Sequence, residues 1–152
     1  MTLSQTIECN SVGADNYSLT WLQSSLDSLK PDLVVFTGDQ LNGQDTSWAA
    51  HSTMLKFTPL LWERKLPWVV IFGNHDGEND YDTNESEMEL YRSMPGCLSE
   101  AGPSGVEGIG NYVRGIRDYR SNTTLFNLYF LDSHVGPSRL IRYFSLMGGR
   151  DC

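Results

Sequence analysis

The sequence is poor in cysteine and has no long apolar run. Its three cysteines, Cys9, Cys97 and Cys152, are odd in number and far apart, which argues against a disulfide framework and fits a reducing compartment. No stretch approaches the ~18 uninterrupted apolar residues of a membrane span. Residues 1–16 have neither the basic start nor the apolar centre of a secretion signal. We therefore expect a cytoplasmic protein that has no membrane partner.

Basic residues are scarce relative to acidic ones. The chain has 11 Lys and Arg against 19 Asp and Glu, and its formal net charge is −8 at pH 7. A chain of this charge repels a polyanion, so nucleic acid is not an expected partner. Apolar residues make up 39% of the chain and aromatic residues 11%, which excludes a disordered or collagen-like protein.

The length fits one domain followed by a short tail. A compact domain of about 150 residues buries roughly 70% of the surface that its unfolded chain exposes, which is enough for one core. Residues 135–152 differ from the rest, because they contain three arginines and no acidic residue before Asp151. We expect a domain over residues 1–134 and a tail over residues 135–152, in which a weak apolar periodicity permits a helix.

The first half of the chain alternates between helix and strand patterns. Leucines recur every three or four residues from Leu19 to Leu29, which predicts a helix capped by Asp15 or Asn16 that ends before Pro31. This apolar face should pack against a sheet. The continuous apolar run at residues 32–37 then predicts a buried strand.

A second helix and strand follow in the same order. Residues 47–64 predict a helix that starts at Ser47 and is kinked or split by Pro59. The apolar run at residues 68–72 predicts another buried strand, which ends at Gly73. A strand-helix-strand unit favours a right-handed crossover and a parallel pair, so the expected fold class is α/β.

Shorter elements occupy the second half. The sequence predicts an acidic loop at residues 74–82, a helix at residues 85–94 and a glycine-rich loop at residues 95–110. Alternating patterns at residues 111–116 and 124–131 then predict an antiparallel β-hairpin.

Polar residues that can bind metal follow three of the predicted strands. In open α/β sheets, ligands bind beyond the carboxyl ends of the strands. Here those ends are Gly38-Asp39-Gln40, Gly73-Asn74-His75-Asp76 and Asp132-Ser133-His134. A Gly-Asp pair is weak, because about nine in ten such pairs only turn the chain. A given tetrapeptide such as Gly-Asn-His-Asp occurs by chance in about one chain in a thousand of this length.

The order of these two motifs resembles the second and third signature blocks of the calcineurin-like metallophosphoesterases. The segments TGDQLNG and GNHDGE are similar to a branch found in fungi and plants that is related to purple acid phosphatases. The similarity runs from about Asp15 to His134 and is specific at the two blocks. It implies an incomplete layered metallophosphoesterase fold. It also implies metal-dependent hydrolysis of phosphate monoesters by a phosphatase, which includes the possibility of a protein phosphatase.

The resemblance also implies roles for four residues and a metal pair of Fe, Mn or Zn. Two divalent cations ~4 Å apart repel by on the order of 20 kcal/mol at an effective dielectric near 20, so they need a shared anion. By resemblance Asp39 is that bridging ligand, and Asn74 binds one metal. His75 stands over the phosphate as a hydrogen-bond donor and general acid, and Asp76 orients it. The ordinary alternatives are a turn at Asn74, an exposed His75 and a solvated loop carboxylate at Asp76.

Several ligands of the family are absent from their expected places. The family opens with Asp-x-His and closes with a lone His and a Gly-His-x-His block. His51 falls in a predicted helix as a surface residue, whereas Asp132 and His134 follow Gly-Asn-His-Asp and would bind metal only in a rearranged topology. We therefore expect a truncated domain, with an exposed apolar sheet face or an unpaired strand edge. The alternative is a non-catalytic binding or regulatory protein on a degenerate phosphoesterase fold.

Overall fold

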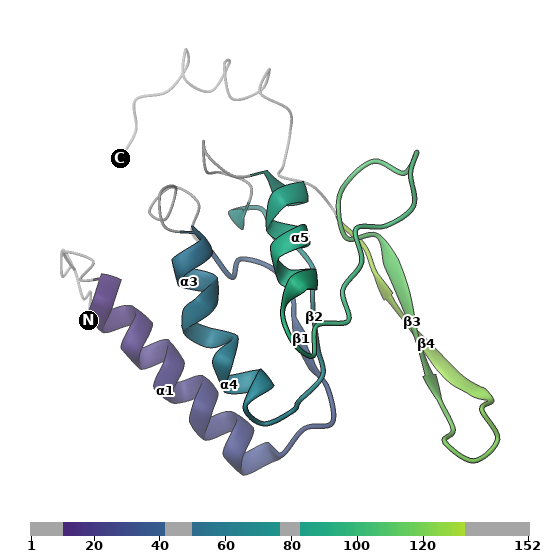
Figure 1. The fold of residues 1–152 in the computed structure, drawn as a ribbon, viewed down its shortest axis with the longest axis horizontal. Helices are drawn as coiled ribbons and strands as arrows, with labels where there is room; N and C mark the ends of the chain where they lie inside the picture. Colours follow the sequence, from purple (N-terminus) through teal and green to yellow (C-terminus); the bar gives the residue numbers. More distant parts are fainter. Residues whose placement is uncertain (1–10, 42–49, 77–82, 133–152) are drawn as a thin grey trace, which may run out of the picture.

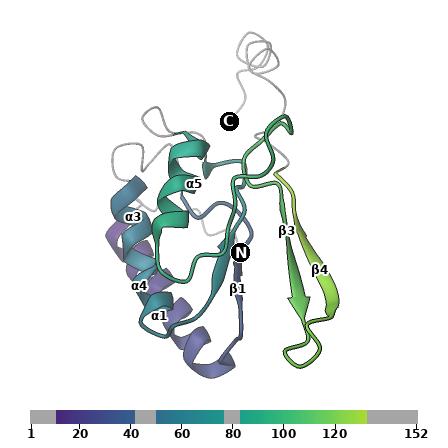
Figure 2. The same cartoon turned by 45° about the vertical axis from the view of Figure 1, so that its right-hand side comes forward.

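The computed structural model describes residues 11–41, 50–76 and 83–132, and these form three layers. In this part of the chain, four helices lie on one side of a two-stranded parallel sheet, and a β-hairpin lies on the other side (Figures 1 and 2). The predicted α/β class is thus confirmed. None of the described helices is both long enough and apolar enough to span a bilayer.

Helix α1, Ser11–Leu29, is the helix that the leucine spacing predicts. It begins one turn earlier than expected, so the predicted cap at Asp15 or Asn16 is wrong. No proline at residues 11–14 stops the helix. The Asp15 carboxylate instead accepts a hydrogen bond from Lys56 Nζ at 2.5 Å.

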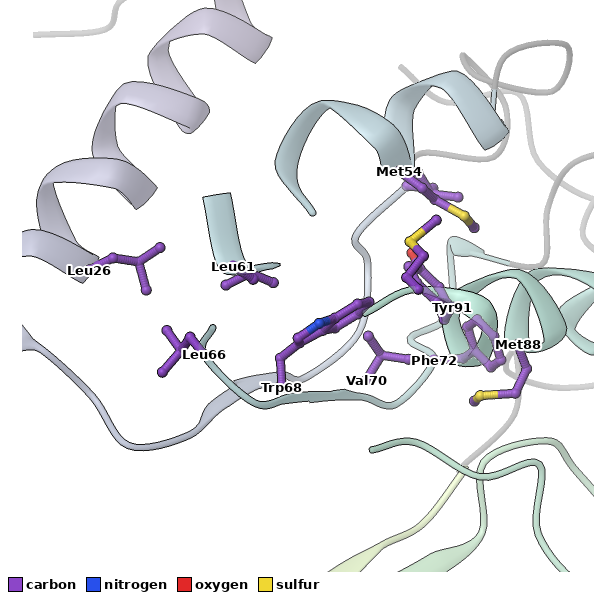
Figure 3. Packing of buried hydrophobic residues seen from close by; sticks show 11 residues of the cluster. Leu26, Met54, Leu61, Leu66, Trp68, Val70, Phe72, Met88 and Tyr91 are labelled. Atoms are coloured by element: carbon purple, nitrogen blue, oxygen red, sulfur yellow. The ribbon is translucent and has the colours of Figure 1, made fainter. Parts of the chain in front are cut away.

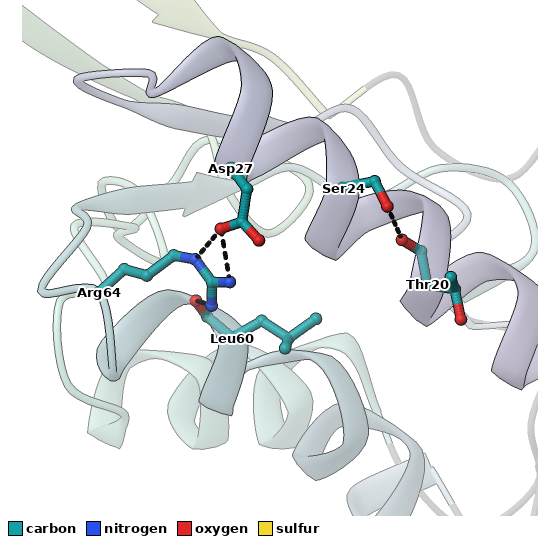
Figure 4. Close-up of polar contacts among 5 residues, drawn as sticks. All are labelled: Thr20, Ser24, Asp27, Leu60 and Arg64. Atoms are coloured by element: carbon teal, nitrogen blue, oxygen red, sulfur yellow. Dashed lines mark hydrogen bonds and ion pairs between the residues drawn. The ribbon is translucent and has the colours of Figure 1, made fainter.

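Helix α1 also contacts the core and α4 at its C-terminal end. Leu26 is buried in the core, but Leu29 is 75% exposed, so the predicted apolar face is only partly covered. Arg64 donates two hydrogen bonds to Asp27 Oδ1, at 3.1 Å from Nε and 2.8 Å from Nη2 (Figure 4). Arg64 Nη1 also donates to the Leu60 carbonyl at 2.9 Å, and this arrangement ties α1 to the end of α4.

The two predicted parallel strands are adjacent. Strand β1, Val34–Phe36, pairs in parallel with β2, Trp68–Val70, with Val35 opposite Val69. Between them lie α3, Ala50–Phe57, and α4, Pro59–Trp62. Proline has no N–H to continue the helix, and the predicted split at Pro59 is confirmed.

Helix α5, Asn84–Ser93, begins with a capping box in which Thr83 and Ser86 bond reciprocally. The segment after it runs along the outer edge of β2. The Trp68 N–H donates to the Gly96 carbonyl at 3.0 Å, and the Val70 N–H donates to the Ser99 hydroxyl at 2.7 Å. This edge of the sheet is therefore closed.

The predicted hairpin is confirmed. Strands β3, Tyr112–Arg117, and β4, Thr124–Phe130, are antiparallel. The rings of Tyr112 and Phe130 stack at 4.6 Å and pack with Val69 in a small core. The Tyr112 hydroxyl donates to the Val70 carbonyl at 2.6 Å, which fixes the hairpin against β2.

The main core fills the space between the sheet and the helices. Trp68, Val70 and Phe72 project from β2 and the residues after it toward α3 and α5 (Figure 3). Trp68 and Tyr91 meet edge to face, with ring centroids 5.9 Å apart. Alternate residues of β2 thus serve two layers, because neighbouring side chains of a strand point to opposite faces.

An open groove lies between α1 and β1. It has a volume of about 900 Å³ and runs from Tyr17 and Trp21 to Gly38 and Asp39. Within the described ranges, β1 has β2 as its only strand neighbour, so its second edge is unpaired. The unpaired edge that we expected is therefore present.

Four predictions lie outside the described residues. These are the cap at Ser47, the loop end at residues 77–82, His134 and the tail at residues 135–152.

Candidate functional site

The loops that follow β1 and β2 touch each other through two glycines. Gly38 has φ of 108°, and Asp39 has φ of 54°. A Cβ on Gly38 would lie 2.6 Å from Gly73 Cα, and a Cβ on Gly73 would lie 2.3 Å from Asp39 Oδ1. Only glycine allows this approach, so the two motifs meet because both begin with Gly.

The Asp39 side chain lies against the second motif. The backbone N–H of His75 donates a hydrogen bond to Asp39 Oδ1 at 3.0 Å. The side chains of Asp39, Asn74 and His75 are exposed. The structure thus brings the three predicted residues together at one edge of the sheet, with polar atoms that face solvent.

Asp76 is fully buried, so the alternative of a solvated loop carboxylate is wrong. Its Oδ2 accepts the backbone N–H groups of Asp39 and Gly73, both at 2.7 Å, and its Oδ1 accepts that of Leu41 at 3.0 Å. This carboxylate therefore clamps the two loops together. Sequence reasoning missed this role. The available signal was a short acidic side chain within a few residues of a strand end, which is well suited to accept loop N–H groups.

Burial raises the pKa of Asp76, because a charged carboxylate loses its hydration there. The three backbone N–H groups oppose this effect, and the charge of Asp39 adds to it. The site thus combines two nearby acidic groups with one histidine, His75, and the two motifs themselves contain no Lys or Arg.

Two other candidate residues lie elsewhere. His51 is exposed on α3, as expected. Asp132 Oδ2 accepts the Ile109 N–H at 2.9 Å, and the Asp132 N–H donates to Asn111 Oδ1 at 2.9 Å. Asp132 thus anchors the glycine-rich loop to the end of β4.

The described residues fit only part of a metal centre. Asp39 and Asn74 offer exposed oxygen atoms, which hard cations accept. However, no group of three or more His, Cys, Asp or Glu side chains in residues 11–41, 50–76 and 83–132 could hold a metal ion. A dinuclear centre is therefore incomplete within this part of the chain.

Sequence comparison places these motifs in a known context. The family model described as calcineurin-like phosphoesterase matches residues 11–151. No solved structure matches the chain.

Curated relatives cover most of the chain. A probable inactive purple acid phosphatase 29 from Arabidopsis thaliana is 40% identical over 112 residues, or 68% of this chain and 28% of that protein. The phosphatase DCR2 from Saccharomyces cerevisiae is 37% identical over 128 residues, or 80% of this chain and 22% of that protein. A probable inactive purple acid phosphatase 14 from Arabidopsis thaliana is 37% identical over 129 residues, 78% of this chain and 32% of that protein. The chain thus spans between a fifth and a third of the length of these relatives.

Proposed function

Because the chain belongs to the calcineurin-like phosphoesterase family, we propose that it forms the part of a phosphomonoesterase domain that carries the bridging ligand and the general acid. The observation that carries this proposal is the hydrogen bond from the backbone N–H of His75 to Asp39 Oδ1 at 3.0 Å. This hydrogen bond joins Asp39, the proposed metal ligand, to His75, the residue proposed to contact the phosphate. The proposed substrate is a phosphorylated molecule.

Each residue has a distinct task in this proposal. Asp39 and Asn74 contribute oxygen ligands, and the metal pair supplies an activated water when bound. The exposed imidazole of His75 donates a hydrogen bond to the phosphate and a proton to the leaving oxygen. Asp76 holds the backbone of both loops, so the direction of the Asp39 and His75 side chains depends on it.

The remaining ligands would come from polypeptide beyond the described residues. The length of the relatives supports this, since the chain spans only 28% of one and 22% of another. The unpaired edge of β1 also supports it. A further parallel strand at that edge would end beside Asp39, because parallel strands end on the same side of a sheet. We propose on these grounds that the chain is a truncated form.

A second candidate function also has specific support. Two of the relatives are named probable inactive purple acid phosphatases, and the ligand set here is incomplete. A degenerate phosphoesterase fold that binds phosphorylated partners without hydrolysing them fits both observations.

A paired comparison of chains separates these functions. We would measure hydrolysis of aryl and alkyl phosphates with Mn²⁺ or Fe²⁺/Zn²⁺, for the 152-residue chain and for a form extended at both ends by its genomic sequence. The enzyme proposal predicts little turnover by the short chain and metal-dependent turnover by the long one. In the long form, His75→Ala should slow turnover, because it removes the proposed general acid. His51→Ala is the matched control, because His51 is also an exposed histidine. An inactive long form that still binds phosphorylated ligands would favour the second candidate.

A further inference from the structure

One face of α5 places two polar side chains inside the core. Glu87 is 2% exposed and Tyr91 is fully buried. They are four residues apart, so they lie on the same side of the helix. The Tyr91 ring lies 6.4 Å from the ring of Phe72, and Phe72 directly precedes Gly73, whose N–H binds Asp76 (Figure 3). Tyr91 therefore lies directly behind the clamped loops.

The Tyr91 hydroxyl has no hydrogen-bond partner among the described residues. Buried polar groups in folded proteins are satisfied in the great majority of cases, by protein atoms or by ordered water. Burial raises the pKa of Tyr91, and the charges of Asp76 and Glu87 raise it further. Glu87 lies one turn earlier on the same buried face of α5, and Asp76 binds the N–H of Gly73, the residue after the Phe72 ring that packs near Tyr91. Neither carboxylate accepts a hydrogen bond from the Tyr91 hydroxyl directly.

We propose that one ordered water molecule binds between Tyr91, Asp76 and Glu87 and makes Tyr91 a positioning residue for the loop clamp. The water accepts a hydrogen bond from the Tyr91 hydroxyl and donates one hydrogen bond to each of the two carboxylates. Buried waters typically make two to four such bonds to polar groups that lack direct partners. The neighbouring side chains of Met54 and Met88 are flexible thioethers that adapt to small changes in volume.

This link would couple α5 to the candidate site. The Asp76 carboxylate holds the N–H groups of Asp39, Leu41 and Gly73. A water that fixes this carboxylate from behind, in a region of low dielectric, strengthens the whole network. The inference does not depend on catalysis, because the clamp is present whether or not the chain is an enzyme.

Tyr91→Phe in the full 152-residue chain tests the inference by amide hydrogen exchange. If the water bridge is present, this variant removes a hydrogen-bond donor to the water and weakens the clamp made by the Asp76 carboxylate. The amides of Asp39, Leu41 and Gly73 should then exchange about tenfold faster. The amides of β2 at Val69 and Val70 should keep their protection, which a general loss of stability would not allow. Thermal unfolding should show a variant that is less stable than the parent.

The opposite results would overturn the inference. If the hydroxyl is simply unsatisfied, Tyr91→Phe removes a buried donor, so the variant should be more stable and the three amides unchanged. Tyr119→Phe is the matched control, because Tyr119 is 84% exposed and should show neither effect. A high-resolution crystal structure with no water beside the Tyr91 hydroxyl would contradict the proposal independently of the exchange data.

Discussion

The carboxylate of Asp76 accepts a hydrogen bond at 2.7 Å from the backbone N–H of Asp39, a residue that lies 37 positions earlier in the chain. The same oxygen accepts the N–H of Gly73 at 2.7 Å. One buried side chain thus holds the ends of two neighbouring parallel strands in register. The exposed residues of the candidate site depend on this internal contact.

Replacing Asp76 should destabilise the protein, even by a side chain of the same size. Asp76→Asn keeps the shape of the side chain but leaves one acceptor oxygen for three N–H donors and adds a donor that faces them. We expect a loss of about 2 kcal/mol in the free energy of unfolding, since buried donors lose a charged acceptor. Urea denaturation at pH 7 measures this. Asp32→Asn, at an exposed position, is the control; equal stability of both variants would contradict the clamp.

The glycine contact between the two loops gives a second prediction. Gly38→Ala forces a side chain into a backbone with φ of 108° and places its Cβ 2.6 Å from Gly73 Cα. We expect a loss of at least ~1–3 kcal/mol, the usual cost of such strain. Gly13→Ala is a matched control, because its Cβ meets nothing within 4 Å and a helix favours alanine. Thermal unfolding should show opposite shifts for the two variants, and a shift in the same direction would count against the contact.

The raised pKa of Tyr112 predicts that the protein loses stability at high pH. Burial raises its pKa from 10.0 to about 12, although the hydrogen bond with Ser99 acts against this. The folded state favours the protonated phenol, so this contribution is complete below pH 10 and is lost as the pH rises through about 12. In Tyr112→Phe the stability should therefore fall less steeply between these pH values. Chemical denaturation across this range checks the slope, and Tyr119→Phe should keep the slope of the parent.

The groove between α1 and β1 predicts that the chain binds apolar molecules and associates with itself. Val35 is 41% exposed and Leu29 is 75% exposed, and both line the groove. The purified chain should bind a hydrophobic dye and associate at high concentration, because an unpaired edge with apolar surface attracts other chains. Leu29→Lys should reduce both effects, whereas Tyr119→Lys, at a distant exposed aromatic residue, should not. A chain that stays monomeric and binds no dye would contradict this prediction.

The sequence was sufficient to predict most of the helices and strands, and to place the two motifs at neighbouring strand ends. Apolar runs predicted β1 and β2, because such patterns depend only on local residues, and Pro59 predicted the break between α3 and α4. The burial of Asp76 could not be predicted, because it arises when two segments far apart in the chain come together. The exposure of Leu29 has a similar origin, since periodicity identifies an apolar face but not whether other residues cover it.

The hydrogen bond from the Val70 N–H to the Ser99 hydroxyl determines the edge at which the sheet can accept a further strand. A side-chain oxygen occupies the position that a further strand would need on the outer edge of β2. Any added strand must therefore join on the side of β1. Asp39 would then no longer lie at the margin of the sheet but in the middle of three strand ends, where side chains from both neighbours could surround it.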